Sequence, residues 1–179
     1  MSIAERYRPH YTYEDYCLWE GKWELIEGMP YAMSPAPIPE HQRTSFKLSM
    51  CFEMSLTSCK NCKVYPPLDW KIEEDTIVQP DIIIVCKPIL KKFLDFKPAL
   101  VVEILSPSTA SKDRGEKMEL YQSQQVKYYL IVDTKFKKIE IYQFVAGKYD
   151  LVAISPLNFL FILEETNCKA DVNFLGIWD

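Results

Sequence analysis

The stretch Pro98-Ala-Leu-Val-Val-Glu-Ile-Leu105 decides the fold, because it is a short and nearly continuous apolar run of the kind found in buried central strands. Glu103 interrupts this run. A second acid, Asp81, stands in another apolar run, Val78-Gln-Pro-Asp-Ile-Ile-Ile-Val-Cys86. An ionised carboxylate is costly inside a sheet, so each acid must be paired, protonated or bound to a metal. On adjacent strands the two carboxylates would meet at one edge of the sheet and suit Mg²⁺.

The alternative for each acid is a structural ion pair with an arginine or lysine. A cation is available on the segment that follows Glu103, where Asp113 and Lys117 are four residues apart and share one helical face. This pair is either a surface ion pair or a means of bringing Lys117 back over the two carboxylates. Spacing alone leaves both interpretations open.

The pattern around these two runs predicts an α/β protein with a central mixed β-sheet flanked by helices. A capping box at Thr12 opens a short helix at residues 13–19, and apolar residues at intervals of three and four predict a long helix at 40–58. A third helix is expected at 112–125. Strands are expected at 23–28, 29–33, 64–65, 68–72, 77–86, 100–105, 127–132 and 138–145. We predict one domain over residues 1–179, with an N-terminal extension (1–39), a core (40–145) and a β-rich tail (146–179).

Charge is unevenly distributed along the 179 residues, although the net charge is only −4. From Lys87 to Lys138 there are 11 basic and 6 acidic residues, a local charge of +5. Most surface lysines are simply solvated. The alternative interpretation is an electropositive rim that attracts a phosphate backbone, with Lys112 and Arg114 as its nucleic-acid-binding residues.

The six cysteines are expected to be free thiols in a reducing compartment, because a chain of this length can form its own core without disulfides. Cys59 and Cys62 have the spacing of half a zinc site, but no second close pair follows. They are interpreted as two ordinary thiols in a turn. No run approaches the roughly 18 apolar residues that a membrane span needs, and a secretion signal is not evident. A cytoplasmic protein without a membrane partner is therefore expected.

Several motifs in the same order resemble the Uma family, a group of predicted restriction endonucleases in the PD-(D/E)XK nuclease superfamily. The resemblance rests on the Asp81 and Glu103 runs, Ser106-Pro-Ser-Thr109, Asp113-Arg-Gly-Glu-Lys117 and Tyr121. It continues upstream through Tyr11-Thr-Tyr-Glu-Asp-Tyr16, Trp23-Glu-Leu-Ile-Glu-Gly28, Met33-Ser-Pro-Ala-Pro37 and His41, and downstream through Val126-Lys-Tyr-Tyr-Leu-Ile-Val-Asp133. The similarity covers nearly the whole chain to about residue 149.

The resemblance implies a restriction-endonuclease-like fold with Asp81 and Glu103 as metal ligands. Leu105 stands where the superfamily motif has its lysine, so Lys117 becomes the candidate catalytic lysine and Lys112 a weaker one. A second tier of pocket residues comprises His41, Asp113, Glu27 and Glu40.

The implied activity is hydrolysis of DNA phosphodiester bonds by a metal-activated water, with Mg²⁺ as cofactor and Mn²⁺ as a substitute. Cleavage of both DNA strands favours a homodimer, because it needs two sites of opposite polarity. Leu105 favours one alternative, a catalytically degenerate nucleic-acid-binding module on the same fold. The other alternative is an interaction protein whose buried acids are paired structurally.

Overall fold

The computed structural model describes residues 8–33, 37–163 and 168–179. The helices are α2 (Tyr13–Tyr16), α3 (Pro39–Ser55), α4 (Ala110–Arg114) and α5 (Glu116–Ser123). The strands are β1 (Trp23–Ile26), β2 (Met29–Ala32), β3 (Lys63–Tyr65), β4 (Trp70–Glu73), β5 (Thr76–Val78), β6 (Ile82–Val85), β7 (Leu100–Ile104), β8 (Tyr128–Asp133), β9 (Lys138–Val145), β10 (Lys148–Ile154), β11 (Asn158–Leu163) and β12 (Cys168–Asn173). No helix in these ranges is long and apolar enough to cross a membrane.

A six-stranded sheet in the order β10-β9-β8-β7-β6-β3 forms the centre of the protein. Strands β7 and β8 are parallel and the other neighbours are antiparallel, so the predicted mixed sheet is confirmed. The run around Glu103 is β7, a strand buried along its whole length. Its position inside the sheet explains why it is apolar on both faces.

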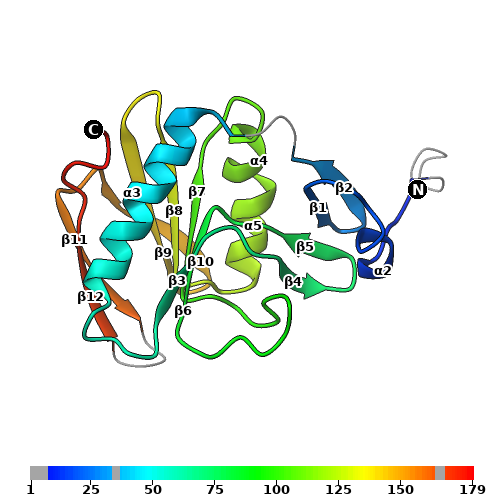
Figure 1. The fold of residues 1–179 in the computed structure, drawn as a ribbon, viewed down its shortest axis with the longest axis horizontal. Coiled ribbons are helices and arrows are strands. Elements are labelled where there is room, and N and C mark those ends of the chain that lie inside the picture. Colours follow the sequence, from blue (N-terminus) through cyan, green and yellow to red (C-terminus); the bar gives the residue numbers. More distant parts are fainter. Residues whose placement is uncertain (1–7, 34–36, 164–167) are drawn as a thin grey trace.

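Alternate side chains of the central strands form two separate apolar cores. On one face, α3 and the β11–β12 hairpin pack against residues such as Ile82, Val102 and Leu130. On the other face, Ile83, Val101 and their neighbours pack against α5 and residues of the small sheet. Figure 1 shows α3, β11 and β12 on one side of the sheet and α4 and α5 on the opposite side. Glu103 alternates with Val102 and therefore points toward the side of α5.

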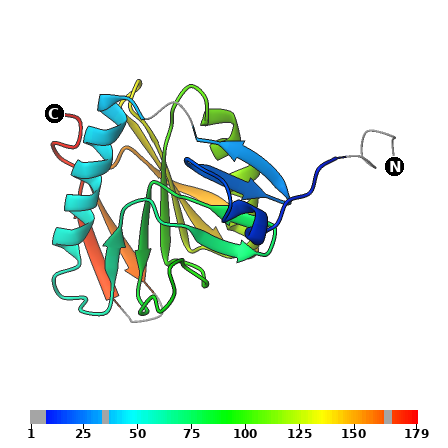
Figure 2. The same ribbon diagram turned by 45° about the vertical axis from the view of Figure 1, so that its right-hand side comes forward.

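A second, four-stranded sheet has the order β2-β1-β5-β4 and joins the N-terminal segment to the core. The expected antiparallel return of residues 29–33 forms β2. The prediction of one strand at residues 77–86 is wrong, because this segment forms two strands, β5 in the small sheet and β6 in the large one. Pro80 lies at the division, where it has no N–H to offer a ladder. In Figures 1 and 2 the small sheet lies on the side of α4 and α5, away from α3.

The helix predicted at residues 112–125 is interrupted, which corrects a second expectation. Gly115 separates α4 from α5, with φ −113° and ψ −99°, outside the helical range. A Cβ atom at this position would lie 3.1 Å from the carbonyl oxygen of Ser111. The absence of a side chain at residue 115 thus permits the break.

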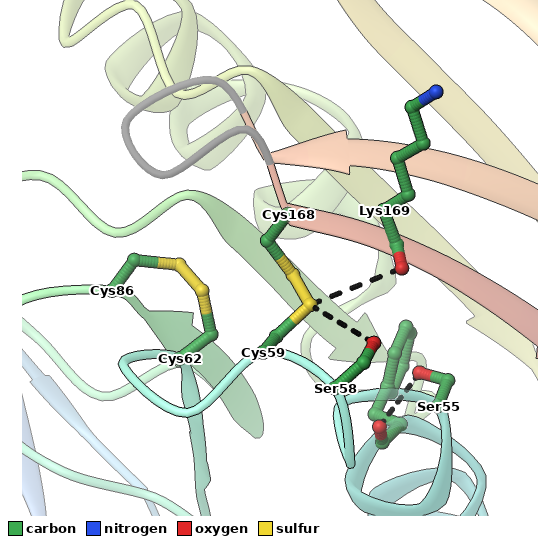
Figure 3. The surroundings of a disulfide bond; sticks show 8 residues. Ser55, Ser58, Cys59, Cys62, Cys86, Cys168 and Lys169 are labelled. Atoms are coloured by element: carbon green, nitrogen blue, oxygen red, sulfur yellow. Dashed lines mark hydrogen bonds between the residues drawn. A yellow bond between two sulfur atoms is a disulfide. The ribbon is translucent and has the colours of Figure 1, made fainter.

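Four cysteines form two disulfides, Cys59–Cys168 and Cys62–Cys86 (Figure 3), so the expectation of free thiols is wrong for them. The pairing of Lys63 with Val85 places Cys62 opposite Cys86 at the next position of the β3–β6 ladder. The other two cysteines, Cys17 and Cys51, are free. The sequence does not reveal this pairing, because the fold brings Cys86 and Cys168 to the turn that contains Cys59 and Cys62.

We expect Cys168→Ser to lower the free energy of unfolding of the oxidised protein by about 2–5 kcal/mol, because the lost disulfide joins residues 109 positions apart and restrains the unfolded chain. Urea denaturation without reductant measures the change. Cys17→Ser is the control, since that thiol is exposed and unpaired. Equal unfolding midpoints for wild type and Cys168→Ser would contradict this role of the disulfide.

A buried carboxylate and lysine cluster as the candidate active site

Asp81 and Glu103 lie at the same edge of the central sheet. The antiparallel register pairs Ile82 with Val102, so Asp81 and Glu103 occupy the next opposing positions of β6 and β7. Asp81 Oδ2 accepts a hydrogen bond from the Ile104 amide at 2.7 Å, which fixes the carboxylate against β7. The two acids that interrupted the apolar runs are thus brought together by the ladder.

Lys117 is the buried cation of this cluster, with only 2% of its side chain exposed. Its Nζ lies 2.9 Å from Glu103 Oε1, 2.7 Å from Glu24 Oε1 and 3.7 Å from Asp113 Oδ1. Burial disfavours the charged ammonium, but the carboxylates of Glu103, Glu24 and Asp113 outweigh it and hold the pKa of Lys117 well above its usual range. The interpretation of Asp113 and Lys117 as a surface ion pair is therefore wrong.

Glu24 is the site residue that sequence reasoning missed. It is fully buried on β1, where it binds Lys117 and accepts hydrogen bonds from Lys112 Nζ at 2.5 Å and the Gln79 amide at 2.9 Å. Burial would raise the pKa of Glu24, yet the two ammonium groups prevail and lower it. The sequence signal that could have identified Glu24 is an acid between the apolar residues of a short strand. Glu103 was identified by a signal of the same kind.

Of the predicted second-tier residues, His41 and Asp113 lie in the cluster and Glu27 and Glu40 lie at the surface. His41 is buried at the start of α3, and its Nε2 lies 3.2 Å from Asp81 Oδ2. Asp113 is also buried, on α4. Glu27 and Glu40 are exposed. Glu27 lies in the β1–β2 turn with φ +49°, so these two acids do not join the cluster.

The two residues predicted to bind nucleic acid already have carboxylate partners. Lys112 binds Glu24, and its ammonium lies over the ring of Tyr31 at 4.8 Å from the centroid. Arg114 Nη1 contacts Glu140 Oε2 at 2.6 Å, with 40% of its side chain exposed. Of the two, Arg114 is thus the one whose side chain still faces solvent.

The cluster contains more carboxyl groups than ammonium groups. Glu24, Asp81, Glu103 and Asp113 lie around Lys112 and Lys117, and burial raises the pKa of Asp113 against the effect of Lys117. Burial raises the pKa of Glu103 well above its usual range, and the nearby Asp113, Asp81 and Glu24 raise it further against the effect of Lys117. Asp113 Oδ1 is buried without a hydrogen-bond partner.

The carboxyl oxygens of Asp81 and Glu103 are hard donors that fit a divalent cation. Mg²⁺ usually takes one or two carboxylates and completes its shell with water and substrate oxygens. Asp81 and Glu103 would supply those carboxylates. Within the described residues, no group of three or more His, Cys, Asp or Glu side chains is arranged to hold a metal by itself.

A cleft of about 590 Å³ opens beside α3 and reaches the cluster through Asp81 and His41, which both line it. The Asp81 side chain is 16% exposed, whereas that of Glu103 is 4% exposed. Asp81 is therefore the acid that a substrate in this cleft meets first. The remaining walls are mostly apolar and include Phe46, Met50 and Pro66.

The chain has relatives among known proteins. The model of the family described as Uma2, putative restriction endonuclease, matches residues 12–167. The chain belongs to the Uma2 family. This Uma2 chain is 33% identical over 144 residues to the uncharacterized protein slr1290 of Synechocystis sp., covering 75% of the chain and 74% of the relative. It is 27% identical over 137 residues to sll1609 of the same organism, covering 71% and 75%.

A crystal structure of a protein described as a putative nuclease belonging to DUF820, from Anabaena variabilis, matches the Uma2 chain with a TM-score of 0.74. The match covers 94% of this chain and 97% of the other at 12% sequence identity. At this level of sequence identity the match shows a similar fold. It confirms the expected restriction-endonuclease-like α/β architecture.

We expect Glu24→Gln to destabilise this Uma2 protein by roughly 3–5 kcal/mol near neutral pH, because Lys117 and Lys112 lose a buried counter-charge. The lowered pKa of Glu24 means that its contribution is present above the ordinary glutamate value of 4.5 and is lost as the pH falls through the folded-state value. The difference from wild type should therefore shrink below pH 4.5. Urea denaturation at several pH values measures it.

Glu27→Gln is the matched control for this variant, since Glu27 is an exposed glutamate three residues away. Its effect should stay within about 0.5 kcal/mol. If Glu24→Gln and Glu27→Gln have equal stability at neutral pH, the Glu24 ion pairs do not stabilise the fold.

Proposed function

We propose that this Uma2 protein is a Mg²⁺-dependent endonuclease that hydrolyses phosphodiester bonds of DNA. The observation that carries the proposal is the pairing of Asp81 and Glu103 across the β6–β7 ladder at the edge of a nuclease-like sheet, with Lys117 Nζ 2.9 Å from Glu103 Oε1 and Asp81 lining the cleft. Two carboxylates beside a lysine at one sheet edge suit a hard divalent cation and a phosphate group, which is the chemistry of metal-dependent phosphodiester hydrolysis. Family membership and the fold support the same conclusion.

Asp81 and Glu103 are the residues that would hold Mg²⁺, which, when bound, supplies a water of lowered pKa and neutralises charge on the scissile phosphate. The Ile104 amide and His41 orient the Asp81 carboxylate through their contacts with Oδ2. Tyr121 donates a hydrogen bond of 2.6 Å to Glu103 Oε1 and orients the second carboxylate. The ligand oxygens are thus positioned by contacts within the protein before any substrate binds.

Lys117 is the proposed electrostatic partner of the reaction. Its ammonium stays charged because three carboxylates surround it, and it lies beside Glu103. In this role it would stabilise negative charge that develops on the phosphate oxygens. A lysine reaching this place from α5 would take over the role of the motif lysine, whose position directly after β7 is occupied by Leu105.

One observation favours the second candidate, a degenerate nucleic-acid-binding or interaction module. Lys117 is enclosed by three carboxylates and has 2% exposure, so in this arrangement its ammonium does not face the cleft. The candidate predicts nucleic-acid binding without cleavage. We favour the nuclease because Asp81, which is paired with Glu103 across the ladder, lines the cleft.

We expect wild type to nick supercoiled DNA only with Mg²⁺ or Mn²⁺, and Asp81→Asn and Glu103→Gln each to lower the rate roughly 100-fold or more. The reason is that several kcal/mol of charge stabilisation depends on these ligands. Gel assays of plasmid cleavage measure the rates. Asp171→Asn and Glu27→Gln remove exposed carboxylates and should cleave like wild type. Equal cleavage by all five proteins would indicate a contaminating nuclease or another site.

Metal binding itself gives a separate test without DNA. We expect Mn²⁺ at about 100 times its dissociation constant to stabilise the wild-type fold by about 2.7 kcal/mol, because the ion binds only the folded site. A thermal unfolding scan with and without Mn²⁺ measures the shift. Asp81→Asn should lose most of it. An unchanged melting temperature in wild type would favour the interpretation of the acids as structural ion pairs.

A further inference from the structure

Four cysteines from three distant segments gather at one corner of the protein, far along β6 and α3 from the carboxylate cluster. Cys59 and Cys62 lie in the turn after α3, and the Cys62 amide donates to the Cys59 carbonyl at 2.9 Å. Cys86 follows β6, with its Cα 3.9 Å from that of Cys62, and Cys168 begins β12, with its Cα 5.5 Å from that of Cys59. Figure 3 shows both disulfides at this one turn.

The corner supplies what a four-cysteine metal site needs. Structural zinc sites take four thiolates, typically with one Cys-x₂-Cys turn, and are closed to solvent. Here the turn is Cys59-Lys-Asn-Cys62, and all four cysteines are buried, with exposures of 6–8%. The sequence alone offered half of such a site. The fold brings the other half from β6 and β12.

Charge distinguishes these four cysteines from the other two. Each is followed directly by a lysine: Lys60, Lys63, Lys87 and Lys169. Cys17 and Cys51 are followed by Leu18 and Phe52 instead. All four lysines are exposed, so they give this corner positive charge at its surface, while the cysteine side chains are buried.

We propose that Cys59, Cys62, Cys86 and Cys168 form a zinc site when reduced, and that the two disulfides are the oxidised, zinc-free state of the same cluster. In the disulfide state no thiolate is present to bind a metal. Bonds from zinc to four thiolates would hold together the same three segments that the disulfides join. This site is independent of the proposed nuclease activity.

The change between the two states balances with a dithiol as reductant. Each disulfide takes two electrons and two protons and becomes two thiols, while one molecule of the dithiol closes to its own disulfide. Two molecules of dithiol therefore open the cluster. Binding of Zn²⁺ then displaces the four thiol protons and leaves four thiolate ligands. The oxidised form of the dithiol reverses the change: two molecules of it take up four electrons from the ligands and four protons from solvent, the ligands become the two disulfides, and Zn²⁺ is released.

The test uses the full chain in both redox states. One sample is reduced with dithiothreitol and the other is left oxidised; both are freed of reagents without air, incubated with excess Zn²⁺ and desalted. Elemental analysis then gives the zinc content, and intact mass gives the number of thiols. We expect one zinc ion per reduced chain and none per oxidised chain. Co²⁺ in place of Zn²⁺ should give the absorption of a tetrahedral thiolate complex.

Serine variants assign the ligands. Cys59→Ser and Cys86→Ser should each lose stoichiometric zinc, whereas Cys17→Ser and Cys51→Ser should bind it like wild type. If the serine variants fail to fold, the comparison of reduced and oxidised wild type still decides. A reduced wild type that binds no zinc overturns the proposal. So does zinc retained by Cys59→Ser or by chains whose disulfides are intact.

Discussion

The structure depends on one buried ammonium group, that of Lys117, which is shared by carboxylates from three different parts of the chain. Glu24 comes from the small N-terminal sheet, Glu103 from the central sheet and Asp113 from α4. A cation is stable in the interior only while nearby carboxylates compensate its charge, because its transfer from water is costly. The N-terminal sheet is consequently part of the candidate site, since it provides one of the three carboxylates.

The sequence predicted most of the fold because its signals were local. Continuous apolar runs identified the central strands, and the two interrupting acids identified the partners across the β6–β7 ladder. The departures have local causes as well. Pro80 divides a predicted strand between two sheets, and Gly115 divides a predicted helix into α4 and α5. Each of these residues was visible, but its effect depended on which partner strand or turn lay beside it.

The remaining features of the site depend on which residues the fold brings together. The spacing of residues along the sequence does not predict this. Glu24 and Glu27 are both acids of one short segment, and only the strand's position between β2 and β5 decides that Glu24 points inward. The basic stretch from residue 87 to 138 raises the same difficulty. Lys112 and Arg114 are counted there as positive charges, yet both are paired with acids outside that stretch, Glu24 and Glu140. A local charge count therefore overstates the positive surface.

The link between the two sheets is only three residues long, Gln79-Pro-Asp81 between β5 and β6. The Gln79 amide donates to Glu24, and Asp81 accepts from the Ile104 amide on β7, so the first and last residues of the link are attached to different sheets. The docking of one sheet on the other thereby sets the spacing of the carboxylates. Surface turns commonly tolerate a change in length. One residue more or fewer in this link would instead move one half of the cluster away from the other.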